Sequence, residues 1–149
     1  MPPHALYDVL TMFKDIHKVV LDFAEEIDDD QLRWRPRGYS TSIGFHLWHL
    51  ARESDFLKAI ILERTPQLGA EFGEPHEIWA KENLAQKWGF PTELNATVGT
   101  GLSDETVQTL PIPHKKDLIN YLSRSYTAVE QFVGLLDERY PTFENVDDE

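Results

Sequence analysis

The stretch 42–62 constrains the fold of this chain more than any other part of it. Apolar residues recur there at helical spacing, and proline and glycine interrupt the pattern a few residues later. We therefore predict a long helix that Ser42 or Thr41 caps and that extends to about Glu63. Its predicted buried stripe consists of Ile43, Leu50, Leu57, Ile60 and Ile61.

Two histidines and a glutamate fall on or beside this apolar stripe. At about 100° of rotation per residue, Glu53 lies near its centre, His46 lies beside Glu53, and His49 lies towards one edge. Trp48 and Asp55 point in nearly the opposite direction, so Trp48 is expected to contact either a loop or another subunit. Because buried polar groups need partners, the surroundings of this helix determine the kind of site.

Two further long helices are predicted on the same grounds, over residues 5–27 and 114–139. In the second of them Ser125 lies at the centre of the apolar stripe, and Tyr121 and Tyr126 flank it. The other residues of that stripe are Leu118, Leu122, Val129, Phe132, Val133 and Leu136.

The region between the second and the last long helix shows a broken pattern. A weaker helix is predicted over 77–88, a loop over 92–101 and a short helical turn from 103. We therefore expect an all-α fold, a bundle of four main helices with a broken third segment. It forms a single domain over residues 1–143, and an acidic tail follows over 144–149.

Composition excludes several classes of function. The 149-residue chain has 26 acidic and 14 basic residues and a net charge of −12, which argues against binding to nucleic acid or to an anionic membrane. It has no cysteine, so a disulfide, a thiolate metal site and a cysteine nucleophile are excluded. Without an apolar segment of about 18 residues or a signal-peptide pattern, we expect a cytoplasmic protein.

His17 falls in the middle of the apolar stripe of the first helix. It precedes the end of that helix by about 15 Å, and Glu53 follows the start of the second helix by about 16.5 Å, at 1.5 Å per residue. If the two helices pack antiparallel, His17 and Glu53 lie at the same level and form a buried pair. One interpretation of this pair is structural, a core histidine with its acceptor.

The other interpretation is a divalent metal site. Histidine nitrogen and carboxylate oxygen are ligands for zinc, nickel, manganese or iron, and helical bundles build such sites from facing helices. His46 and His49 are three residues apart, and His49 and Glu53 are four apart, so neighbouring pairs converge. The candidate metal ligands are His49, His46, Glu53 and His17, and Glu53 and His17 are also the candidate catalytic groups.

The chain resembles the DinB-like superfamily, which includes metal-dependent hydrolases of the YfiT type and thiol-dependent S-transferases. The resemblance is most specific over Ser42–Arg52, which is followed by Asp55, and it includes Trp34-x-Pro36 before that stretch. The later matching residues are Ile78-Trp79, Trp88-Gly89-Phe90-Pro91, Gly99-x-Gly101 with Ser103, and Tyr121-Leu122. The resemblance implies a four-helix bundle of up-down-down-up order that is often dimeric.

The resemblance also implies a divalent metal, often nickel or zinc, with three ligands. One is a histidine that matches His49, and the other two come from the last long helix, where Tyr121 and Ser125 are the inward-facing pair here. Neither is a good ligand at neutral pH. Either the site is rebuilt from the four candidates, with His76 and His114 as outside candidates, or metal binding is weak or lost.

Two functions follow as expectations. The first is a divalent-metal-dependent hydrolase or a small-thiol-dependent transferase, with nickel, zinc or manganese and a small-molecule substrate. The second is a non-catalytic helical bundle without metal, which acts as a small-ligand-binding or dimeric interaction module. A homodimer is expected in both cases. The sequence leaves open the substrate, the reaction and whether the protein is an enzyme.

Overall fold

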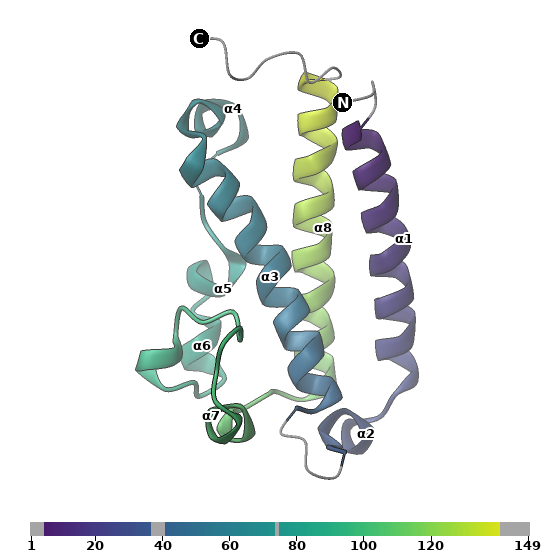
Figure 1. The fold of residues 1–149 in the computed structure, drawn as a ribbon, viewed down its shortest axis with the longest axis vertical. Coiled ribbons are helices and arrows are strands. Elements are labelled where there is room, and N and C mark those ends of the chain that lie inside the picture. Colours follow the sequence, from purple (N-terminus) through teal and green to yellow (C-terminus); the bar gives the residue numbers. More distant parts are fainter. Residues whose placement is uncertain (1–4, 37–40, 74, 141–149) are drawn as a thin grey trace.

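Three long helices form the frame of the molecule: α1 (Ala5–Glu26), α3 (Ile43–Arg64) and α8 (Lys115–Arg139). The computed structural model describes residues 5–36, 41–73 and 75–140, and within them it is all-α, as predicted. The predicted tail 144–149 lies outside the described residues. Helix α8 packs against both α1 and α3 and lies between them (Figure 1). No helix in the described part of the chain is long and apolar enough to span a membrane.

Short helices complete the fold and confirm the broken third segment (Figure 1). The predicted helix over 77–88 is two separate four-residue helices, because Asn83 between them adopts a left-handed conformation with φ of 56°. The detailed helix arrangement implied by the resemblance stays a prediction. The short elements are α2 (Asp29–Arg33), the 3₁₀ turn η1 (Pro66–Leu68), α4 (Gly69–Phe72), α5 (Ile78–Lys81), α6 (Leu84–Lys87), the 3₁₀ turn η2 (Thr92–Leu94) and α7 (Asp104–Thr109).

Side chains cap three of the described helices, α2, α3 and α7, and in α7 the Ser103 hydroxyl accepts a hydrogen bond from the Thr106 amide at 3.2 Å. The Ser42 hydroxyl accepts a hydrogen bond from the Phe45 amide at 3.1 Å, so the predicted cap of α3 is confirmed. Asp28 begins α2 with a capping box: its carboxylate accepts from the Gln31 amide at 2.8 Å, and the Gln31 side chain accepts from the Asp28 amide at 3.0 Å. The aspartates after α1 therefore start a helix and do not only interrupt one.

The predicted buried face of α3 is wrong. Leu50 is 39% exposed and Glu53 is exposed, whereas Trp48 and Asp55 are buried. Periodicity of aliphatic residues failed here because the buried face is built from aromatic, small and hydrogen-bonded charged side chains. The buried residues of α3 are Gly44, Phe45, Leu47, Trp48, Ala51, Arg52, Asp55, Ala59 and Leu62. By contrast, α8 buries Tyr121, Ser125 and Tyr126 as predicted.

Trp48 contacts the short segments of its own chain, which answers the question that the sequence left open. Its ring lies 6.1 Å from the ring of Trp79 and 5.3 Å from that of Phe90, measured between centroids. Gly99 covers it from the loop after η2, with φ of 102°, and a Cβ added to Gly99 would lie 2.8 Å from Trp48 Cζ3. The loop therefore approaches the indole as closely as only glycine allows.

We predict that Gly99→Ala destabilises the protein by about 3 kcal/mol, because it adds both an unfavourable φ and a steric clash with Trp48. Gly101→Ala is the matched control, since Gly101 also has positive φ, 77°, but no atom lies within 4 Å of the added Cβ. We expect it to cost about 1 kcal/mol. Urea unfolding measures both, and equal losses would contradict the close packing of Gly99 on Trp48.

Candidate functional site

A cluster of charged and polar side chains lies in the interior between α3 and α8. Its centre is Arg52, which is 0% exposed, with Asp55, which is 5% exposed. Arg52 Nη1 lies 3.8 Å from Asp55 Oδ2 and donates hydrogen bonds to Glu77 and, at 3.4 Å, to the Tyr121 hydroxyl. Arg52 Nε donates to the Thr97 carbonyl at 3.0 Å. The guanidinium therefore connects α3 to α8 and to the loop after η2.

Asp55 attaches α5 to α3. Its carboxylate accepts hydrogen bonds from the backbone amides of Ile78 and Trp79, both at 2.9 Å, and from the Tyr121 hydroxyl at 2.9 Å. The indole of Trp79 also lies under the Arg52 guanidinium, 4.8 Å from the ring centroid, and donates to the Asn95 carbonyl at 2.6 Å. One aspartate thus satisfies the first amides of a helix from another part of the chain.

Burial raises the pKa of the Tyr121 phenol far above its ordinary value, and Asp55 adds to the rise by repelling the phenolate. Arg52 opposes the rise without cancelling it. The phenol therefore keeps its proton at neutral pH, which agrees with its role as the donor to Asp55. A protonated phenol is a poor metal ligand, because ligands bind in their deprotonated form.

Three polar atoms in this interior have no hydrogen-bond partner among the described residues: Arg52 Nη2, Ser125 Oγ and Trp48 Nε1. Two of them belong to the cluster region, since Ser125 follows Tyr121 by one turn of α8. The unpaired atom of Arg52 is a cationic donor in a fully buried position. The charge of Arg52 is nevertheless matched by the carboxylates of Asp55 and Glu77, so the guanidinium engages both carboxylates and they are not open to a metal cation.

His49 lies outside this cluster, on the partly exposed side of α3. Its Nδ1 lies 2.6 Å from the Val98 carbonyl oxygen and 3.9 Å from Glu53 Oε1. A carbonyl only accepts, so Nδ1 carries the proton and Nε2 of the neutral ring is unprotonated. The loop carbonyl therefore orients the imidazole and leaves one nitrogen able to accept a proton.

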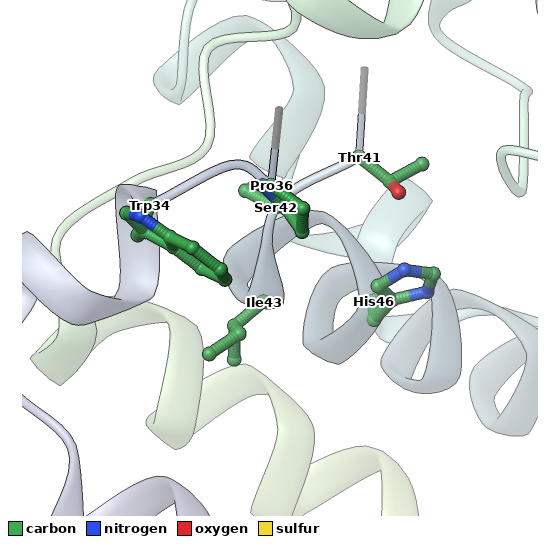
Figure 2. Close-up of a pocket in the computed structure, with 6 residues that line it drawn as sticks. All are labelled: Trp34, Pro36, Thr41, Ser42, Ile43 and His46. Carbon is green, nitrogen blue, oxygen red and sulfur yellow. The ribbon is translucent and has the colours of Figure 1, made fainter. Parts of the chain in front are cut away.

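His46 and Glu53 are both exposed. Glu53 accepts a hydrogen bond from the Thr100 hydroxyl at 3.2 Å. His46 lies at the edge of a mainly apolar cavity of about 210 Å³ at the start of α3, and Figure 2 shows Trp34 on the side opposite His46. The cavity is lined by Trp34, Pro36, Thr41, Ser42, Ile43 and His46. Its lining combines the Trp34-x-Pro36 motif with the first turn of α3.

The predicted pairing of His17 with Glu53 is wrong. His17 is buried, 7% exposed, but its partner is Glu130 of α8, with 2.6 Å between His17 Nδ1 and Glu130 Oε1. The imidazole also stacks on Tyr126, 3.7 Å between centroids. The error arose because α8, not α3, packs against α1. The sequence did not indicate Glu130 as the partner, because it lies beside the apolar stripe of α8, where charged residues are common.

The structure does not bring the four candidate ligands together. His49 and Glu53 are neighbours, but His46 lies at its own cavity and His17 is paired on the other side of α8. Within the described residues no three His, Asp or Glu side chains are grouped as metal ligands. Of the outside candidates, His114 lies 3.7 Å from Asp29 Oδ1 and His76 lines a second cavity. The residues that the structure describes therefore do not fit a three-ligand metal centre.

Fold and interior together define an all-α protein whose long helices enclose a hydrogen-bonded charged cluster. The family profile of the DinB superfamily matches residues 12–147, so the chain belongs to the DinB superfamily. Comparison with curated proteins and with solved structures gave no match. The expected family is confirmed, and the reaction, the metal and the substrate remain proposals.

We predict that Asp55→Ala lowers the free energy of unfolding by about 3–5 kcal/mol. The substitution removes one of the two carboxylates that pair with the buried Arg52, and it removes the acceptor of three hydrogen bonds. Tyr121→Phe removes one hydrogen bond and should cost about 1–2 kcal/mol. Ser54→Ala is the control, because Ser54 is next to Asp55 and its side chain has no hydrogen-bond partner within the described residues. We expect it to change the free energy of unfolding by no more than about 0.5 kcal/mol. Urea unfolding measures all three. An Asp55→Ala protein as stable as Ser54→Ala would contradict the stabilising role of Asp55 in the buried cluster.

Proposed function

We propose that this DinB-superfamily protein binds a small molecule and has no three-ligand metal centre of the family type. The buried cluster of Arg52, Asp55 and Tyr121 is the observation behind the missing metal centre, and the cavity that Asp55 and His76 line is the observation behind ligand binding. The cluster occupies the interior where the last helix of the family would provide two ligands. Tyr121 is kept protonated there, and Ser125 offers only a hydroxyl.

A second candidate is a metal-assisted hydrolase or a small-thiol-dependent transferase, and the orientation of His49 favours it. Metal-bound histidines commonly donate their other ring N–H to a backbone carbonyl, which is what His49 does toward Val98. Glu53, 3.9 Å from the same ring, adds a carboxylate. In that function His49 Nε2 would bind the metal, and the metal would lower the pKa of a bound water or thiol. The thiol must come as a cosubstrate because the chain has no cysteine.

Metal analysis separates the two candidates. We expect the purified protein to carry no stoichiometric metal, and we expect Ni²⁺, Zn²⁺ and Mn²⁺ to leave its melting temperature unchanged, because three ligands do not converge. The same titration on His49→Ala shows whether any bound metal depends on His49, and His46→Ala is the control at an exposed histidine. Stoichiometric metal that is lost only in His49→Ala would overturn the first candidate and support the second.

We also propose that the protein forms a homodimer through α1. Four large apolar side chains on this helix are exposed at spacings of four, three and four residues: Met12, Ile16, Val19 and Phe23. This is the pattern of a helix face that packs on another helix. In an antiparallel pair of copies, Met12 would meet Phe23 and Ile16 would meet Val19, so the face is complementary to itself, as a two-fold interface requires.

Sedimentation equilibrium tests the dimer. We expect the wild-type chain to be dimeric and Val19→Glu to be monomeric, because the substitution places a charge on the contact face. Val19 is 69% exposed, so the folded monomer should tolerate the change. Leu50→Glu on α3 is the control and should stay dimeric. A wild-type monomer, or a dimer that only Leu50→Glu dissociates, would contradict the proposal.

A further inference from the structure

A cavity of about 290 Å³ opens beside the buried cluster, between α3, α5 and α8. It is distinct from the cavity at His46, and Asp55 is the one residue of the cluster that contributes to its wall. Its lining residues are Ser54, Asp55, Lys58, His76, Ile78, Lys81 and Ala128. We refer to it as the Lys58 pocket.

The uncompensated charge of the Lys58 pocket is positive. Neither Lys58 nor Lys81 forms an ion pair or a hydrogen bond within the described residues. The carboxylate of Asp55 already accepts three hydrogen bonds. Glu82, next to Lys81, forms its ion pair with Arg124, and Lys81 attracts it without forming an ion pair. The chain has a net charge of −12, so a cavity with two lysines that form no ion pair is a locally positive site on an acidic protein.

The remaining wall supplies hydrogen-bonding groups and apolar surface. Ser54 and His76 have no hydrogen-bond partner within the described part of the chain. Ile78 and Ala128 provide apolar contact. Most of the lining residues are thus polar or charged, and a ligand that fits the pocket needs a charged group as well as an apolar part. The cavity at His46 lacks such charges, because its lining is mainly apolar.

We infer that the Lys58 pocket binds a small organic carboxylate, with the carboxylate group between Lys58 and Lys81 and an apolar body against Ile78 and Ala128. Its volume equals that of roughly ten water molecules at about 30 Å³ each, which limits the ligand to about ten non-hydrogen atoms. The inference rests on the proposed ligand-binding function and names its pocket and the chemical class of its ligand.

Benzoate is a suitable probe, because it combines a carboxylate with an apolar ring of this size, and benzamide is its neutral counterpart. Titration into ¹⁵N-labelled protein should shift the amide resonances of Ser54, Ile78 and the neighbouring Trp79, with millimolar affinity that weakens at high salt. Benzamide should shift none of these resonances. Backbone resonances respond to binding at the site itself, so the readout needs no enzymatic activity.

The variant Lys58→Gln/Lys81→Gln should bind benzoate roughly tenfold more weakly, since each lysine contributes a modest attraction at a partly exposed site. Lys14→Gln/Lys116→Gln removes the same charge from exposed positions elsewhere and should bind as the wild type does. Absence of benzoate shifts at the pocket, or equal losses in both variants, would overturn the inference. Shifts confined to the cavity at His46 would also overturn it but leave ligand binding standing, whereas a stoichiometric metal that His49 holds would overturn the proposed function.

Discussion

The fold depends on how the chain compensates the buried pair of Arg52 and Asp55. Removing two charges from water costs several kcal/mol per ion, and their mutual attraction repays this only when the remaining donors and acceptors are also satisfied. Here Arg52 Nη2 is the one atom of the pair without a partner among the described residues. The other partners come from separate parts of the chain: the phenol of Tyr121, the first amides of α5, the carboxylate of Glu77 and the carbonyl of Thr97. The electrostatic requirement therefore determines which segments lie against α3.

Local signals in the sequence predicted the helices well. Spacing, caps and breakers placed the three long helices to within a residue or two, and the apolar stripe of α8 was found with Ser125 at its centre. The buried face of α3 was not found, because hydropathy counts Arg52 and Asp55 as surface residues. Their burial depends on partners more than twenty residues away in sequence, such as Glu77 and Tyr121. Periodicity contains no information about such partners.

In the candidate site, too, the sequence predicted local features and failed to predict partners that are distant in the chain. Sequence reasoning correctly expected a buried histidine at position 17 with a carboxylate partner, and it failed to choose Glu130 because the choice depends on which helix lies next to α1. It also identified Tyr121 and Ser125 as the inward-facing pair of the last long helix, where both are buried, and it left open whether they replace the family's ligands. It could not anticipate that Arg52 reaches the same interior, since only the three-dimensional packing brings that side chain beside Tyr121.

The attachment of α5 through Asp55 also has a consequence for the order of folding. A helix of four residues has no stability of its own, because helix nucleation is costly and each added residue contributes little. Its first amides find their acceptor only after α3 has formed and the side chain of Asp55 is held beside Tyr121. The segment that carries α5 and α6 therefore assembles late, on a surface that the long helices have already built. Local opening of this segment would leave the long helices intact and would remove Ile78 and Lys81 from the wall of the Lys58 pocket.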